Sequence, residues 1–257
     1  MTEDHQRWRF GLVGAALLAG LVMAFSRPPF AQDAAYHAFA DSREIGGLPN
    51  FWNVFTNLPF LLAGFFGLRS LRRLRRPEFA TGFAVFATGA ALVAFGSTWY
   101  HLAPSNATLV WDRLPMTVGF MALFTLVVRD RLSESIGRWA LGPLLVIGAS
   151  SALYWYATEL QGRGDLRAYY LVQFLPMALI PLLLLTGPGG GGLRAPWLWA
   201  TLALYLLAKQ AESHDRAIFA ATGLLSGHSL KHLVASGAVF CALLAAVRPA
   251  GTPPDAA

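Results

Sequence analysis

The chain has 257 residues, of which 55% are hydrophobic and only 13% charged, and its formal net charge is +6. A soluble domain has about 25% charged residues, so this composition excludes a soluble globular protein and predicts a membrane protein. The net positive charge does not indicate nucleic-acid binding, because the arginines lie mostly between apolar segments, where they determine membrane topology. The single cysteine, Cys241, lies in the last apolar segment and excludes an intramolecular disulfide.

Eight apolar segments are long enough to cross a bilayer, whose hydrocarbon core of about 30 Å needs about 20 helical residues. In chain order they cover residues 9–25, 51–68, 79–100, 108–128, 139–158, 168–186, 197–212 and 228–247. The connections between them are short. We therefore predict an all-α integral membrane protein that forms a single helical bundle without a separate soluble domain.

The first of these segments has two interpretations. Arg7 and Arg9 precede the apolar run Phe10–Phe25, as in a secretory signal peptide. The residues that follow, Ser26 to Pro29, do not form a typical small-x-small cleavage site. We therefore expect a retained helix.

The arginines predict the orientation of the bundle. With eight spans both termini lie on one side, and twelve arginines fall there, against five on the other side. The twelve are Arg7, Arg9, Arg69, Arg72, Arg73, Arg75, Arg76, Arg129, Arg131, Arg138, Arg194 and Arg248, and the five are Arg27, Arg43, Arg163, Arg167 and Arg216. Arginine-rich loops stay in the cytoplasm, so we expect cytoplasmic termini in a bacterial-type plasma membrane.

Three histidines form the candidate site. His228 and His232 are four residues apart and therefore share one face of the last helix, and His101 ends the third apolar segment. All three fall at the outward-facing end of their segments. Three neutral imidazoles leave one position of a tetrahedral zinc ion open, which is the pattern of catalytic zinc sites. The sequence therefore predicts a catalytic zinc centre at the outer face of the membrane.

Ser97 and Asp112 lie at the same end of the bundle. Ser97 is one helical turn before His101, and Asp112 begins the next apolar segment. Asp112 is a candidate general base that takes a proton from the attacking water, with that water or Arg113 as its partner. Ser97 is a candidate donor to a developing oxyanion. Both also have structural interpretations, as a residue that favours a helix N-terminus and as a hydroxyl bonded to a helix carbonyl.

Other polar residues have structural interpretations. Asn53 and Asn57 share a helix face and are expected to bond to neighbouring helices. His37 and His214 lie in loops and are expected to be solvated, His5 lies in the N-terminal tail, and none of the three is expected to be a ligand. An ion-pair cluster at the outer interface is expected from Lys209, Glu212, Asp215 and Arg216.

The ordered set of Ser97 and His101, then Asp112, then His228 and His232 resembles the motifs of the alkaline ceramidases and of the wider CREST superfamily, which includes the adiponectin receptors. The stretch Phe51–Asn57 resembles the start of the first core helix in that family. The resemblance implies zinc binding by the three histidines, oxyanion stabilisation by Ser97 and activation of water by Asp112. It implies hydrolysis of the N-acyl amide of ceramide or a similar N-acyl lipid to an amine and a fatty acid.

The resemblance also implies a division of the chain. The family has seven core helices, so residues 51–247 would be the catalytic bundle, residues 1–50 an additional N-terminal transmembrane helix with an outer loop, and residues 248–257 a tail. Animal members bind calcium through an acidic segment before the core. Here the segment 41–50 is less acidic, contains Arg43 and ends on Asn50 in place of glutamate, which argues against calcium.

Two alternatives remain open from the sequence. One is a lipid-sensing receptor of the same superfamily, although no long cytoplasmic domain is present to carry a signal. The other is a proton-coupled transporter that uses Asp112 and the histidines as a relay, although we find no internal repeat of the kind that transporters show. For the amidase that the resemblance implies, the expected partners are a ceramide-like lipid substrate and membrane lipids, with no nucleic acid.

Overall fold

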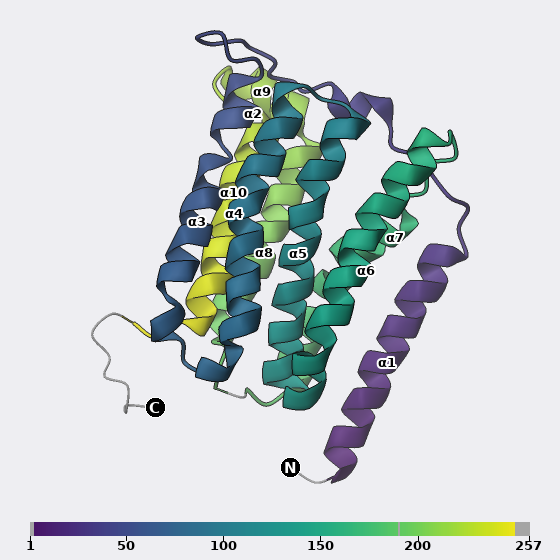
Figure 1. Cartoon of the computed structure of the whole chain (residues 1–257), viewed down its shortest axis with the longest axis vertical. Coiled ribbons are helices and arrows are strands. Elements are labelled where there is room, and N and C mark those ends of the chain that lie inside the picture. Colours follow the sequence, from purple (N-terminus) through teal and green to yellow (C-terminus); the bar gives the residue numbers. More distant parts are fainter. Residues whose placement is uncertain (1–2, 190, 250–257) are drawn as a thin grey trace.

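A computed structural model describes residues 3–189 and 191–249 of the chain. Within these ranges the chain is helical, without a named strand, and the long helices run side by side in one bundle (Figure 1). The elements are α1 (Glu3–Phe25), η1 (Ala34–His37), α2 (Phe51–Phe55), α3 (Leu58–Arg69), η2 (Leu71–Arg73), η3 (Pro77–Phe79), α4 (Ala80–Leu102), α5 (Asn106–Arg131), α6 (Glu134–Leu160), α7 (Arg167–Thr186), α8 (Ala195–Ser213), α9 (Asp215–Thr222) and α10 (Gly227–Ala246). This confirms the predicted all-α membrane bundle.

Seven segments in the described part of the chain are long and apolar enough to cross a membrane, and they correspond to seven of the eight predicted spans. The exception is α8, which carries Lys209, Gln210 and Glu212 near its end. Its 19 residues correspond to about 28 Å of helix, and it packs along α10 inside the bundle. Because α7 ends and α10 begins at opposite ends of the bundle (Figure 1), α8 crosses from one end to the other.

The second predicted span is broken in two. Pro59 has no N–H, and its ring conflicts with the carbonyl of the residue four positions earlier, so a continuous helix through this point is unfavourable. The structure ends α2 at Phe55 and starts α3 at Leu58. Thr56 and Asn57 form the junction, and both side chains are buried. The break therefore places two polar side chains inside the bundle.

Two glycines allow close helix contacts next to the candidate site. A Cβ on Gly96 of α4 would lie 2.1 Å from the carbonyl oxygen of Trp111 in α5. A Cβ on Gly227, the first residue of α10, would lie 2.1 Å from the carbonyl oxygen of Ala211 in α8. Only glycine permits these approaches. They bring the ends of α4, α5, α8 and α10 together at one end of the bundle.

The N-terminal helix lies at the edge of the bundle (Figure 1). α1 packs on α7, where Gly20 faces Leu175. It begins at the end of the bundle where α10 finishes, whereas α9 and the start of α10 lie at the opposite end. Of the predicted tail 248–257, residues 250–257 lie outside the described residues. The three-part division of the chain stays a prediction.

Candidate metal centre

His101, His228 and His232 meet at the end of the bundle that holds the start of α10. Their ring centroids are 4.9 Å apart for His101 and each of the other two, and 5.0 Å apart for His228 and His232. Each residue offers one nitrogen, and these three atoms lie within 4.8 Å of one another. All three side chains are buried. The structure therefore brings together the three predicted ligands, two from one face of α10 and one from the last turn of α4.

Three ring nitrogens of this cluster lack protein partners. Within the described residues, Nδ1 and Nε2 of His101 and Nε2 of His228 are buried without a hydrogen bond. A buried polar atom without a partner is unfavourable by several kcal/mol relative to water, on the order of 2–7 kcal/mol. Converging lone pairs of three imidazoles are the donors that a tetrahedral zinc ion prefers. The residues present therefore fit a zinc ion.

The orientation of His232 is fixed by Thr56, which sequence reasoning missed. The Thr56 hydroxyl donates to the carbonyl oxygen of Trp52 at 2.6 Å, and its oxygen lies 3.0 Å from Nδ1 of His232. The hydroxyl hydrogen is already used, so the oxygen accepts from Nδ1–H of His232. That tautomer leaves the lone pair of Nε2 free for a metal. The signal in the sequence was Pro59, which breaks the helix just after Thr56.

The loop before α2 covers the histidine cluster at this end of the bundle. The centroid of the Phe39 ring lies 4.8 Å from that of the His101 ring and 4.6 Å from that of the His228 ring. The carboxylate of Asp215 holds this loop to α10, because it accepts from the backbone N–H of Ala40 at 2.9 Å and of His228 at 2.7 Å. This loop therefore shields the cluster from water.

His37 differs from expectation. Its ring nitrogens lie 3.0 Å from the Tyr100 hydroxyl and 3.0 Å from Oδ1 of Asn106, so it is partly buried and hydrogen-bonded. It is not one of the three clustered histidines. His214 is exposed at the end of α8, as predicted. The predicted interhelical bond of Asn53 is present, because its Oδ1 accepts from the Ser229 hydroxyl at 2.7 Å.

A cavity of about 200 Å³ begins beside His232 and is lined by Ser97 and Asp112 at its polar end. Both residues are buried and line the same cavity. Gly96 makes this proximity possible, because it lets α4 approach α5 at this level. The structure therefore places the two predicted catalytic side chains in the same cavity as one of the predicted ligands.

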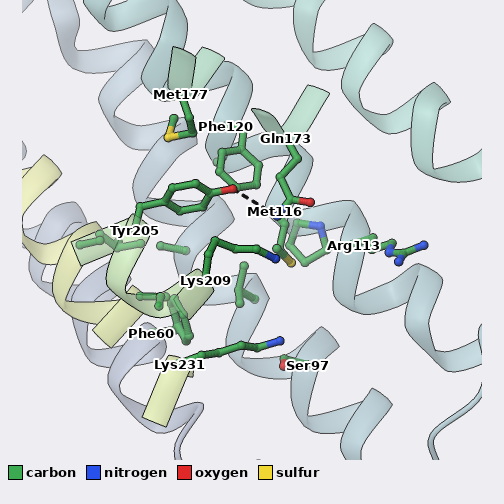
Figure 2. Close-up of a pocket in the computed structure, with 18 of the residues that line it drawn as sticks. Phe60, Ser97, Arg113, Met116, Phe120, Gln173, Met177, Tyr205, Lys209 and Lys231 are labelled. Atoms are coloured by element: carbon green, nitrogen blue, oxygen red, sulfur yellow. Dashed lines mark hydrogen bonds between the residues drawn. The ribbon is translucent and has the colours of Figure 1, made fainter. Parts of the chain in front are cut away.

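The rest of the cavity is mostly apolar. Its lining includes Phe60, Met116, Phe120 and Met177 around the centre (Figure 2). Along α10 the lining runs from Lys231 to Ala242, which is about 16 Å of helix. One polar pair interrupts it, where Gln173 donates to the Tyr205 hydroxyl at 3.3 Å. The cavity thus combines one charged end with an apolar depth suited to a hydrocarbon chain.

Arg113, one of the two partners proposed for Asp112, has other neighbours. Its guanidinium carbon lies 4.0 Å from the centre of the Trp155 ring and 4.5 Å from that of Tyr169, and Nη2 donates to Gln32. Figure 2 shows its side chain directed away from Ser97. Arg113 stacks on aromatic rings, and within the described residues it makes no hydrogen bond with Asp112.

The expected ion-pair cluster at the outer interface is partly wrong. Lys209 does pair with Glu212, but both line the cavity. Lys231, which lies between the two histidines of α10, joins the same carboxylate. Asp215 is instead the acceptor that holds the loop and α10 together. Helical spacing predicts that Lys209 and Glu212 lie near each other. Whether their face of α8 turns toward the cavity or the membrane depends on tertiary packing.

Asp41 and Arg43 form a closed pair in the loop before α2. Nε and Nη2 of Arg43 donate to the two carboxylate oxygens of Asp41 at 2.8 and 2.7 Å. Arg43 also donates to the carbonyl oxygens of Gly223 and Leu224. The Arg43 guanidinium holds the pKa of Asp41 below its ordinary value, chiefly through these hydrogen bonds. Both oxygens of the carboxylate are therefore occupied by a protein cation.

Comparison with known proteins identifies one family. A family model described as Ceramidase matches residues 48–181, just over half of the chain. The match starts close to the beginning of α2 and includes Ser97, His101 and Asp112, and it ends before His228 and His232. No curated protein matches the chain.

Proposed function

Because the chain belongs to the ceramidase family, we propose that it is a zinc-dependent membrane amidase. In this proposal it hydrolyses the N-acyl amide bond of ceramide or a similar N-acyl lipid to an amine, such as a sphingoid base, and a free fatty acid. One observation carries the proposal beyond the family: three buried histidines cluster, two of them with unpartnered ring nitrogens, and the third, His232, lines the charged end of an otherwise apolar cavity.

His101, His228 and His232 are the proposed metal ligands. When bound, zinc would supply Lewis-acid chemistry at the amide carbonyl and lower the pKa of water in the site. Thr56 holds the ring of His232 in the tautomer that a metal needs. Phe39 shields two of the ligands from bulk water. The three imidazoles are neutral when they bind, so they add no negative charge to the centre.

Asp112 is the proposed proton acceptor and donor. Its carboxylate would take the proton of the attacking water and then give it to the amide nitrogen as the carbon–nitrogen bond breaks. Ser97 lines the cavity beside this carboxylate. Rotation about the Cβ–Oγ bond would let its hydroxyl donate to the acyl oxygen as negative charge develops there. These roles are those predicted from the sequence.

The cavity is the proposed acyl-chain site. An amide near His232 and Asp112 would leave the hydrocarbon chain along α10 toward Ala242, among apolar side chains. Burial of that chain is favourable by roughly 0.8 kcal/mol for each methylene group removed from water. The lipid substrate would thus be oriented by its tail, with the amide at the charged end.

The proposed location is a bacterial-type plasma membrane, with both termini in the cytoplasm and the site toward the outer face. The excess of arginine at the end where α1 begins and α10 finishes supports this orientation. The histidine cluster lies at the other end of the bundle.

A screen of N-acyl lipids tests the proposal. Purified wild-type protein and His232→Ala are incubated with ceramides and other N-acyl amides, and released fatty acid is measured by mass spectrometry. We expect release only by the wild type. Binding of a lipid without release would favour a receptor, and movement of protons or solute in vesicles without release would favour a transporter.

A further inference from the structure

Lys209, Glu212 and Lys231 form a charged group on one wall of the cavity, and the proposed reaction does not use it. Lys209 and Glu212 lie one turn apart on α8, and Lys231 lies on α10 next to His232. Lys231 donates to Oε1 of Glu212 and Lys209 to Oε2. Figure 2 shows the side chains of Lys209 and Lys231 directed into the same space, with Lys231 extending toward Ser97.

Both oxygens of the Glu212 carboxylate already accept hydrogen bonds, whereas each lysine ammonium has N–H donors left. Oε1 of Glu212 also accepts from the Tyr36 hydroxyl at 3.3 Å. An ammonium has three N–H donors, and within the described residues each lysine uses one, for Glu212. Lys209 also lies near the Phe174 ring, and Lys231 lies near the Tyr36 ring and the Asp112 carboxylate. This wall therefore offers N–H donors to the cavity, while both oxygens of its carboxylate already accept from a lysine.

The group formed by Lys209, Glu212 and Lys231 holds two positive charges and one negative charge. Asp112 lines the same cavity and is a second carboxylate near Lys231. An ionisable group inside a membrane protein is unfavourable unless it has a function or a partner. An anionic group in the cavity would satisfy the N–H donors that the two lysines leave free.

We propose that Lys209 and Lys231 bind an acidic group in the head of the lipid, so that the preferred substrate is an N-acyl lipid with an anionic head. This rests on the proposed function, because it assigns the substrate class of the same site. Lys231 adjoins His232, so the lysines lie at the level of the amide and not along the acyl chain. The acidic group must therefore lie close to the amide nitrogen, as the carboxylate of an N-acyl amino acid does.

Two ligands that differ in this group alone test the proposal. N-hexadecanoylglycine and N-hexadecanoylethanolamine share the chain and the amide, but one ends in a carboxylate and the other in a hydroxyl. Binding is measured on the full-length, metal-depleted protein in detergent, so that the carboxylate cannot bind the metal. We expect the glycine lipid to bind more tightly by about tenfold or more, as for charge-assisted hydrogen bonds.

Three variants assign this preference to the lysines. Lys209→Met and Lys231→Met should each reduce it severalfold, because each removes an ammonium while keeping an unbranched side chain. Glu212→Gln should increase it, because the lysines lose their internal anion, which a purely structural role would not predict. Arg216→Met, which removes an exposed cation from the same end of the bundle, is the matched control and should leave the preference unchanged.

Equal binding of the two lipids by the wild type overturns the proposal, as does a preference that survives both lysine substitutions or falls in Glu212→Gln. Assays of the zinc-loaded protein separate this from failure of the proposed function. Cleavage of both lipids with equal binding removes the anion site and keeps the amidase. Selective binding without any cleavage keeps the anion site and removes the amidase.

Discussion

The Thr56 hydroxyl oxygen lies 3.0 Å from Nδ1 of His232 and, because its hydrogen is donated to Trp52, it acts as the acceptor. This bond selects one tautomer of a proposed zinc ligand, and loss of such a partner typically lowers metal affinity about 10–100-fold. Thr56→Val keeps the shape and removes the hydroxyl, so zinc should bind more weakly by that factor in competition with a chelator. Thr56→Ser keeps the hydroxyl and should bind zinc like the wild type. Equal affinity in Thr56→Val would show that this bond does not orient the ligand.

The purified protein should contain about one zinc per chain, since the three imidazoles offer one tetrahedral site with a position open. His101→Ala, His228→Ala and His232→Ala should each lose the metal, measured by elemental analysis. His214→Ala, at an exposed position of the same end of the bundle, is the control and should keep it. Full occupancy in any of the first three variants would remove that residue from the site.

Asp112→Asn separates metal binding from chemistry. The amide keeps the shape of the side chain but cannot act as a base, so zinc should remain while hydrolysis falls by about 10²-fold or more. Ser97→Ala should also keep zinc, with a loss of about 10²–10³-fold if the hydroxyl stabilises the oxyanion. Loss of zinc from Asp112→Asn would make the aspartate a ligand, and wild-type rates in both variants would contradict the mechanism.

Reporter fusions test the orientation of the bundle and the crossing of α8. A reporter after Ala257 should read as cytoplasmic, because arginines concentrate at that side. A fusion truncated after Gly187 should also read as cytoplasmic, and one truncated after Gly223 as external, because α8 lies between these points. The same reading at both truncations would mean that α8 does not cross the membrane.

The Asp41–Arg43 pair predicts a pH-dependent contribution to stability and no need for calcium. The pKa of Asp41 is lowered in the folded protein, so its contribution is complete above the unfolded pKa of about 3.9 and is lost as pH falls through the folded value. Arg43→Met should therefore lower the free energy of unfolding at pH 7, measured by chemical denaturation. The difference should shrink below about pH 4.

Calcium is tested separately. Because both oxygens of Asp41 accept from Arg43, a calcium-selective chelator should leave amide hydrolysis unchanged when zinc is supplied in excess. A calcium-dependent rate in the wild type would show that the arginine does not replace the ion.

The hydrophobic pattern of the sequence predicted much of the fold, because a membrane limits which backbone structures can cross it. Backbone groups in a bilayer must be satisfied within the segment, so long apolar stretches become helices with nearly the predicted bounds. The prediction was less accurate where polar residues interrupt that pattern. Pro59 splits the second span, and Lys209 and Glu212 lower the hydropathy of α8, although it crosses the bundle.

The sequence by itself determined which residues are candidates for the site, namely the three histidines, Ser97 and Asp112, and that they share one end of the bundle. Helical spacing and the alternating direction of successive spans can both be read from the order of residues along the chain. Only the tertiary structure decided which other side chains meet them. Thr56, Phe39 and the lysines reach the site from segments far away along the chain, through contacts permitted by Gly96 and Gly227. Such contacts depend on the rotation and separation of packed helices, which the period of one helix does not specify.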